Sequence, residues 1–235
     1  MYCVFCQQSA ESFLPFGLKH DVLTLRRVIG GGYRPNALCP TCFSLDRERS
    51  VFPFLLSHDW LISGAVNLLH VAPERQLAKM LNSHRDITHI STDIRPTGTT
   101  IMDLRQMAFR SDSFDAVICN HVLEHIDDDR AALSEVYRVL RPKRWAIPQV
   151  PISYSIQQTL EDNTIRTAQE REAAYGQTDH VRLYGLDYRG RLESAGFEVV
   201  VTSLRSKFGN EFIAHHSLIA DEGIHMVVKL PSALT

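Results

Sequence analysis

An apolar run that ends abruptly in polar side chains constrains the fold of this chain more than any other feature. The run Phe114–Cys119 (FDAVIC) is bounded by polar residues, a pattern typical of a strand that is covered on both faces. Four polar residues follow it closely: Asn120, His121, Glu124 and His125. In open α/β sheets, ligands bind where the strands end and the loops begin. The sequence therefore predicts a functional site at the exit of this strand.

A helix is predicted directly after this polar loop. Acidic residues at 127–129 stand at its N-terminus, where they favour the helix dipole. Pro142 stops the helix. Between these limits, apolar side chains recur at helical spacing and form one face, which consists of Leu133, Val136, Tyr137 and Leu140.

The stretch 101–142 resembles the middle of a class I S-adenosylmethionine-dependent methyltransferase. It carries the F-D-x-V … H-V-L-E-H loop and the E-x-x-R-V-L-R-P helix of the broad group similar to methyltransferase type 11. The resemblance covers about residues 67–230. It implies a doubly wound α/β fold, a mostly parallel seven-stranded sheet with a C-terminal antiparallel hairpin, and methyl transfer from S-adenosylmethionine. It says little about the methyl acceptor.

Hydrophobic patterns place the remaining elements. A first strand is expected over Asn67–Val71, and Pro73 is expected to open the next helix. Leu77, Met80 and Leu81 form the inner face of that helix. Later elements are a second strand over 87–92, a fifth strand over 145–151 with a bulge at Pro148, a helix over 186–195, and the last strands over 197–202 and 224–230.

Two carboxylates are candidates for binding the adenosine of the cofactor. Asp93 follows the second strand, 23 residues after His70, where an acidic residue accepts hydrogen bonds from ribose hydroxyls. Asp103 matches the position that contacts the adenine amino group in similar methyltransferases, with Leu104 packing on the ring. The alternatives are an ordinary turn aspartate at 93 and a helix N-cap at 103.

The first turn departs from the pattern of similar methyltransferases. That turn is normally glycine-rich, because the backbone must approach the cofactor closely. Here His70, Ala72, Glu74 and Gln76 stand where an acidic residue and three glycines are expected. Glu74 is either the partner of the cofactor's ammonium group or a helix-start carboxylate, and His70 is either a ligand contact or a core histidine. The remaining candidates for binding the cofactor are therefore His70, Ala72 and Glu74 in this turn, and Asn120 and His121 after the strand over 114–119.

Four of the five cysteines form two C-x-x-C pairs, Cys3 with Cys6 and Cys39 with Cys42. Two such pairs complete the tetrahedral sulfur shell of a closed structural zinc site. A redox dithiol needs only one pair, and nothing marks secretion, which argues against two disulfides. Structural Zn²⁺ is therefore the expected cofactor of a module over residues 1–50, ahead of a methyltransferase-like domain over 51–235.

Inside this module, a short strand is expected over Val22–Ile29, and a glycine loop over 30–32. A helix over Ser50–Ile62 follows, with packing residues Phe54, Leu55, Trp60 and Leu61. The pattern C-P-x-C-x-S-L-x-R-x-R and the later L-H-x-A-P-E resemble a bacterial subgroup of zinc-containing methyltransferase-like proteins. Residues 1–60 carry six basic and five acidic side chains, a balance that argues against a dedicated nucleic-acid finger.

The polar segment 152–190 is expected to be an insertion that builds the acceptor pocket. It is rich in hydrogen-bonding side chains, most densely over Gly176–Tyr188. Histidine suits the removal of a proton near neutral pH. His180 is the favoured base because it lies in this segment, and His121 is the second candidate, at the cofactor edge. The alternatives are a solvated, partly helical excursion and structural histidines.

Charge and hydropathy restrict the partners. A net charge of −2 gives no electrostatic attraction to nucleic acid or an anionic membrane, and the sequence contains no apolar run of 18 residues. We expect a cytoplasmic enzyme whose acceptor is a polar small molecule, sugar or glycan. An RNA or protein acceptor gripped by the zinc module is possible but not favoured. A catalytically inactive binding module is a third interpretation, and the sequence does not determine the oligomeric state.

Overall fold

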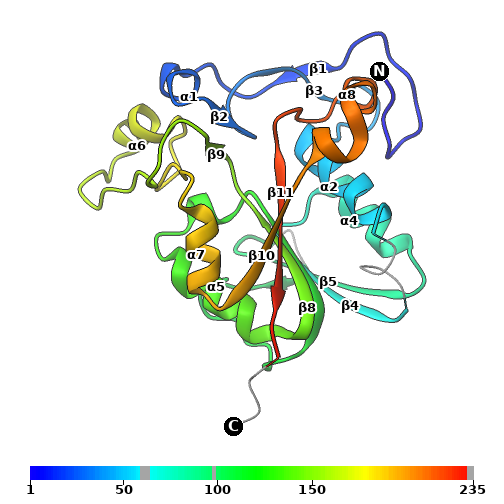
Figure 1. Cartoon of the computed structure of the whole chain (residues 1–235), viewed down its shortest axis with the longest axis vertical. Coiled ribbons are helices and arrows are strands. Elements are labelled where there is room, and N and C mark those ends of the chain that lie inside the picture. Colours follow the sequence, from blue (N-terminus) through cyan, green and yellow to red (C-terminus); the bar gives the residue numbers. More distant parts are fainter. Residues whose placement is uncertain (59–63, 97–98, 232–235) are drawn as a thin grey trace.

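A seven-stranded sheet forms the centre of the molecule (Figure 1). The computed structural model describes residues 1–58, 64–96 and 99–231. The strands lie in the order β10-β11-β8-β7-β4-β5-β6. Neighbours from β8 to β6 pair in parallel, whereas β11 is antiparallel to both β8 and β10. This arrangement confirms the predicted mostly parallel sheet with its C-terminal antiparallel hairpin. The bounds are β4 Val66–Val71, β5 Ile87–Asp93, β6 Thr100–Ile101, β7 Phe114–Asn120, β8 Leu140–Gln149, β10 Phe197–Ser203 and β11 Gly223–Lys229.

Helices cover both faces of the sheet. Figure 1 shows α5 and α7 on one side and α2 and α4 on the other. The bounds are α2 Asp46–Leu56, α4 Arg75–Ser83, α5 Asp129–Val139, α6 Ala168–Tyr175, α7 Tyr188–Ser194 and α8 Leu204–His216, with a 3₁₀ turn, η1, at Leu123–His125. Among the described residues, no helix combines the length and the hydropathy that a membrane span requires.

The two faces of the sheet bury two separate cores. On β7, Val117 and Cys119 pack into the cluster that contains Leu133 of α5. Ala116 and Ile118 alternate with them and pack into the cluster that contains Leu55 of α2. This alternation follows from the two-residue period of a strand. It explains why the β7 sequence is apolar at successive positions rather than at every second one.

Residues 1–50, called the N-terminal segment, form small elements that attach at several points to the rest of the chain, called the body. β1 (Leu14–Phe16) pairs with β3 (Arg34–Leu38), and β2 (Val28–Ile29) pairs with β9 (Ile152–Ser153). A further attachment runs through the Arg49 side chain, which donates to the carbonyl oxygens of His216 and Ser217 at the end of α8. The N-terminal segment is therefore tied both to the C-terminal part of the chain and to the segment after β8.

Several predicted element bounds are wrong. The strand expected over 22–29 is mostly the short helix α1 (Asp21–Leu25), and only its last two residues form β2. α4 begins at Arg75 with Glu74 as its N-cap, so Pro73 precedes the helix. α5 ends at Val139, and Leu140 already belongs to β8. α2 begins earlier than expected, at Asp46. Of its expected packing residues, Phe54 and Leu55 are fully buried, while Trp60 and Leu61 lie outside the described residues.

The irregularity in β8 does not lie at Pro148, where a bulge was expected. Pro148 keeps its regular position opposite Cys119, and the register with β7 shifts earlier, between Leu140 and Trp145. Lys143 takes a positive φ of 63° there. β8 pairs with β11 only through Trp145 and Ala146, and the backbone N–H of His225 donates to the Gln149 side chain instead. The missing N–H of Pro148 therefore interrupts no ladder bond with β11.

Candidate functional site

A cavity of about 530 Å³ opens at the carboxyl ends of the central strands. Asp93, at the end of β5, and Asp103, just beyond β6, both line it. Ala72 after β4 and His121 after β7 line the same cavity, as does Leu104. The parallel topology brings these side chains together, because the ends of neighbouring parallel strands meet at one edge of the sheet.

Asp93 and Asp103, two of the four aspartates that line this cavity, already have partners that orient them. Asp93 accepts the backbone N–H of Arg95 at 2.9 Å. Asp103 forms an ion pair with Arg105, with an N–O distance of 2.7 Å. The hydrogen bonds from Arg105 hold the pKa of Asp103 below its ordinary value. Asp103 therefore stays ionised, and Arg105 contacts both of its oxygens through its backbone N–H, Nε and Nη2.

The first turn, after β4, has no glycine but still takes a glycine-like conformation. Ala72 has a positive φ of 47°, and its N–H donates to the Thr92 carbonyl at 2.7 Å. The neighbouring polar side chains turn inward. His70 lies 2.9 Å from one oxygen of Glu74, and the Asn120 amide donates to the other at 2.5 Å. His70, Glu74 and Asn120 are buried and do not line the cavity. These three side chains therefore do not fill the cavity.

The N-terminus of α4 is occupied by a carboxylate from another helix. Glu48 of α2 accepts the backbone N–H groups of Gln76 and Leu77 at 3.2 and 3.1 Å. The Gln76 side chain in turn donates to the Cys42 carbonyl at 2.8 Å. Glu48 thus neutralises the positive end of the helix dipole, a place where an anionic ligand can bind.

A second cavity, of about 300 Å³, lies between the N-terminal segment and the body. The glycine loop 30–32, Arg34 and Arg47 line one side of it. The body supplies residues of the η1 loop and of the segment 176–180, including His180. His121 and His125 line both cavities, so the two spaces meet at these residues. Sequence reasoning proposed His180 and the 176–188 segment for the acceptor side, and Gly176, Gln177 and His180 of that segment line this cavity. It did not anticipate that the glycine loop and Arg47 form the opposite wall.

The histidines at this junction are arranged around one buried carboxylate. His121 Nδ1 lies 3.4 Å from Glu124 Oε1, and His121 Nε2 has no hydrogen-bond partner in the described part of the chain. Burial lowers the pKa values of His121 and His180 and so favours their neutral forms. Burial opposes the ionisation of Glu124, but the His121 contact and nearby histidines lower its pKa to about 2. A neutral imidazole oriented by a carboxylate can accept a proton through its other nitrogen.

The space between the glycine loop and His121 depends on Gly30 having no side chain. Gly30 has a positive φ of 82°, and a Cβ there would lie 3.3 Å from His121 Cε1 and 3.4 Å from Glu222 Oε1. Glu222 is fully buried and accepts from Gln149, and burial raises its pKa to about 8. Glu222 could not be predicted from the sequence, because it lies between α8 and β11, far along the chain from the other residues of the site. Only the folded structure brings it close to Gly30.

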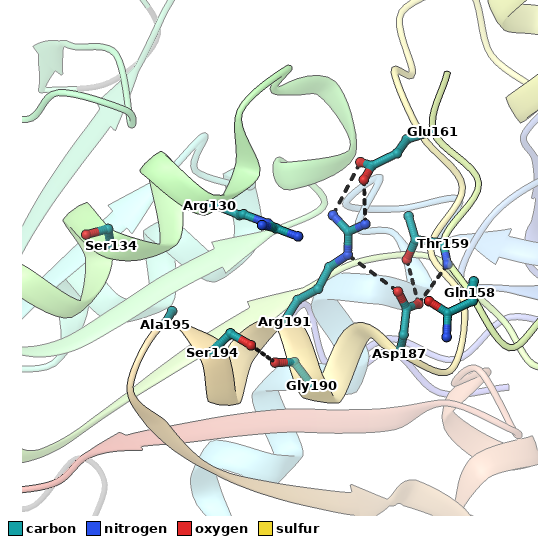
Figure 2. A pocket seen from close by; sticks show the side chains of 10 residues that line it. All are labelled: Arg130, Ser134, Gln158, Thr159, Glu161, Asp187, Gly190, Arg191, Ser194 and Ala195. Carbon is teal, nitrogen blue, oxygen red and sulfur yellow. Dashed lines mark hydrogen bonds and ion pairs between the residues drawn. The ribbon is translucent and has the colours of Figure 1, made fainter. Parts of the chain in front are cut away.

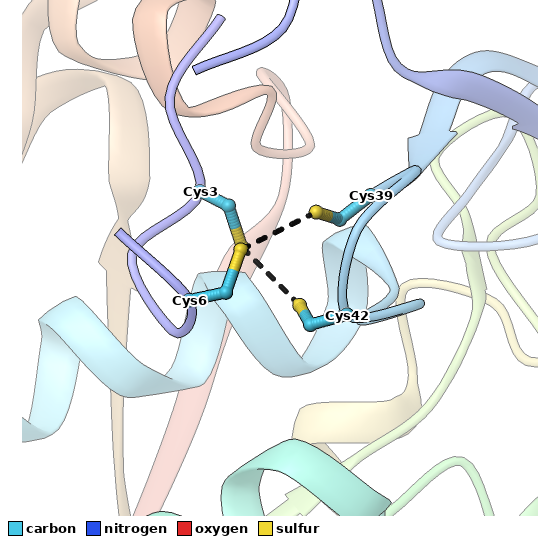
Figure 3. A group of neighbouring side chains, drawn as sticks. All are labelled: Cys3, Cys6, Cys39 and Cys42. Atoms are coloured by element: carbon cyan, nitrogen blue, oxygen red, sulfur yellow. Dashed lines mark hydrogen bonds between the residues drawn. The ribbon is translucent and has the colours of Figure 1, made fainter. Parts of the chain in front are cut away.

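The four cysteines of the two C-x-x-C pairs converge at one point (Figure 3). The sulfur atoms of Cys3 and Cys42 lie 3.6 Å apart, and those of Cys6 and Cys39 lie 3.8 Å apart. Tetrahedral zinc with Zn–S bonds of about 2.3 Å places its sulfurs about 3.8 Å apart. The spacing therefore fits a zinc ion and is far too long for a disulfide.

A larger cavity of about 750 Å³ lies between α5, α7 and residues 158–161 (Figure 2). Its central cation is Arg191, which forms ion pairs with Glu161 at 2.6 Å and with Asp129 at 3.1 Å, while its Nε lies 3.6 Å from Asp187. Asp187 also accepts from the backbone N–H and hydroxyl of Thr159. This network fastens the 152–190 segment to α7, and we assign it a structural role.

A family described as "Methyltransferase domain" matches residues 68–147, which run from β4 into β8. No curated protein matches the chain in sequence. Among solved structures, the [4+2]-cyclase SpnF is 14% identical with a TM-score of 0.54, covering 77% of this chain and 82% of that one.

Two further structures have a TM-score of 0.52. The Burkholderia thailandensis 1,6-didemethyltoxoflavin-N1-methyltransferase, with bound 1,6-didemethyltoxoflavin and S-adenosylhomocysteine, is 12% identical and covers 79% of both chains. A chain of the Haloferax volcanii complex between the Trm112 methyltransferase activator and a methyltransferase is 13% identical, covering 79% of this chain and 92% of that one. These likenesses establish the class I methyltransferase fold. Because that fold also serves a cyclase, they leave the reaction to be argued from the site.

Proposed function

We propose that this chain transfers a methyl group from S-adenosylmethionine to a polar acceptor. The observation that carries the proposal is the shared cavity of Asp93 and Asp103. Their carboxylates come from neighbouring strand ends, they face one space, and buried His70 and Glu74 do not fill it. Asp93 is placed to accept from ribose hydroxyls, and Asp103 from the adenine amino group, with Leu104 against the ring.

The amino acid end of the cofactor needs a partner other than Glu74 or the backbone amides at the start of α4. The α4 amides bond to Glu48, and Glu74 bonds to His70 and Asn120. Arg47 is the candidate that the structure offers, because its buried Nε has no hydrogen-bond partner among the residues the structure describes. It lines the second cavity together with His121. We propose that the Arg47 guanidinium pairs with the cofactor's carboxylate.

The acceptor is proposed to lie in the second cavity, which joins the first at His121 and His125. S-adenosylmethionine supplies a methyl carbon, the electron pair of the breaking C–S bond stays on sulfur, and the acceptor atom gives up one proton. His121 and His180 are the candidates to receive that proton. The lining of arginine, glutamine, glutamate and histidine side chains suits a polar small molecule or a sugar. A structural zinc ion on the four cysteines would hold the wall that carries the glycine loop and Arg47.

A second candidate is a binding module that has lost the cofactor. The observation that favours it is Glu48, which occupies the α4 amides. Titration calorimetry with S-adenosylmethionine and S-adenosylhomocysteine separates the two candidates. The enzyme is expected to bind both ligands, and no heat and no thermal shift at millimolar ligand would leave only the binding module.

Two substitutions locate the cofactor if binding is observed. Asp93→Asn and Asp103→Asn each remove a charged acceptor, which is worth about 1.5–3 kcal/mol, and should raise Kd by about 10- to 150-fold. Asp86→Asn is the matched control, since this exposed aspartate follows α4 and does not line the cavity. Equal Kd values for all three variants would place the cofactor elsewhere.

A further inference from the structure

A cluster of potential metal ligands lies apart from the four cysteines. Glu124, His125 and His180 each place one ligand atom within 4.8 Å of the other two. The first two belong to η1, and His180 lies in the segment after α6. The two segments are fastened together, because the Val181 N–H donates to the Glu124 carbonyl at 2.9 Å and Arg182 donates to the Leu123 carbonyl at 2.9 Å. The three side chains are therefore held in place by backbone contacts.

Glu124 is a buried carboxyl group without a full set of partners. Its side chain is 2% exposed, it lines the second cavity, and its Oε2 has no hydrogen-bond partner in the described ranges. Burial of an incompletely paired carboxylate is costly unless a cation or a donor completes its shell. A bound cation would remove this deficit.

The ligand set indicates the kind of ion. Two imidazoles and one carboxylate suit divalent transition metals, and three protein ligands leave an open coordination position. Bonds of about 2.1 Å place tetrahedral ligands about 3.4 Å apart, so small side-chain rotations from the present spacing would close the shell. Asp179 Oδ2 lies 3.3 Å from His125 Nδ1, as expected for a carboxylate that orients a histidine ligand.

We propose that Glu124, His125 and His180 bind one divalent transition-metal ion, such as Mn²⁺, Fe²⁺ or Zn²⁺, at the wall of the second cavity. The part of this inference that concerns the acceptor rests on the proposed function. The open position faces the space proposed for the acceptor and takes a hydroxyl or carboxylate oxygen of it. A hydroxyl bound to the ion loses its proton to water more readily, which makes the oxygen a better nucleophile. His180 then serves as a ligand, and the acceptor class narrows to molecules that present an oxygen.

Mn²⁺ is the probe, because it prefers oxygen and imidazole ligands and avoids a four-thiolate site. The full-length protein, with any cysteine-bound metal left in place, is titrated with Mn²⁺ and the free ion is measured by electron paramagnetic resonance. We expect one bound Mn²⁺ per chain. Glu124→Gln and His180→Gln should each weaken binding at least tenfold, on the order of the loss seen when metal-site residues are changed. His84→Gln, outside the cluster, is the matched control and should bind as the wild type does.

S-adenosylhomocysteine binding to the same preparations separates this inference from the proposed function. Wild-type protein that binds S-adenosylhomocysteine but no stoichiometric Mn²⁺, or Glu124→Gln and His180→Gln proteins that keep Mn²⁺ affinity, would overturn the metal site and leave the cofactor site standing. Mn²⁺ binding that depends on both residues, without any S-adenosylhomocysteine binding, would support the metal site while the proposed function fails. Circular dichroism identifies a variant that does not fold, and the other variant then decides the outcome.

Discussion

Replacing Arg49 by methionine should destabilise the whole chain, because this side chain joins the N-terminal segment to the C-terminal part of the body. Arg49 is fully buried and has no carboxylate partner among the hydrogen bonds of the described residues. Its guanidinium donates instead to four backbone carbonyls, two before α2 and two at the end of α8, which belong to Ala37, Ser44, His216 and Ser217. Burial lowers the pKa of Arg49, but an arginine keeps its charge at neutral pH.

The magnitude follows from those four acceptors. Each buried carbonyl that loses its donor costs about 1 kcal/mol, and removal of the costly buried charge returns part of the sum. The net loss is about 2–4 kcal/mol for Arg49→Met, because methionine fills similar space and donates nothing. For a chain of this size that corresponds to a decrease in Tm of about 4–16 °C.

Thermal unfolding followed by calorimetry or circular dichroism measures this change. Arg205→Met is the matched control, since Arg205 is exposed and pairs with exposed Asp221, and it should change stability by less than about 0.5 kcal/mol. Metal content is measured in both variants, because Arg49 donates to Ser44, whose hydroxyl contacts the sulfur atoms of Cys3 and Cys42. A change of less than about 1 kcal/mol for Arg49→Met would refute the idea that this arginine holds the two parts together.

Three further predictions concern other parts of the molecule. Cys39→Ser should release the proposed zinc, detected with a chromogenic chelator, and lower Tm, because the buried cluster around Cys3, Phe13 and Cys39 is too small to hold the segment alone; unchanged metal content would exclude a four-cysteine site. Glu48→Gln should lower the free energy of unfolding by about 1 kcal/mol, because α4 loses the carboxylate at its positive end; equal denaturant midpoints would contradict that role. Burial lowers the pKa of His225 to about 4, so the unfolded chain takes up a proton between pH 6.5 and 4 and the native chain does not. The contribution of His225 to stability should therefore fall by about 3 kcal/mol over this range. His225→Phe, which keeps the ring against Tyr188, should remove this share and leave that of the other buried histidines; parallel pH profiles for both proteins would refute it.

The sheet could be predicted because its strands carry their signals locally. β4 and β7 are buried strands whose sequences are largely apolar, whereas β5 is more polar and partly exposed. The topology follows once such strands alternate with helices. The strand predicted over Val22–Ile29 was wrong. The β-branched residues of this segment favour a strand, whereas one turn of helix lets Leu23 reach a buried position. Propensity there was weaker than tertiary packing.

The site could be predicted only in the parts that lie at strand ends. Asp93 and Asp103 follow their strands directly, so sequence position alone brings them to one edge. The contact between Glu48 and the α4 amides joins residues 28 and 29 positions apart, and the contact of Gln76 with Cys42 spans 34. No local pattern marks such pairs, because either partner alone resembles an ordinary surface or capping residue.

The glycine-free first turn becomes understandable through these long-range contacts. Glycines in this turn normally let a ligand reach free helix amides and a close backbone. Here Ala72 alone takes the left-handed conformation, and α2 supplies both the carboxylate that occupies the amides and, one residue earlier, Arg47 with its unpaired Nε. Relative to a glycine-rich turn, the helix terminus is neutralised by Glu48, and the positive charge next to the cavity is that of Arg47, whose Nε has no hydrogen-bond partner among the described residues. A cofactor carboxylate can still be bound in such a cleft, but only while α2 stays docked. The N-terminal segment that positions α2 is then a functional part of the cleft as well as a cap on the fold.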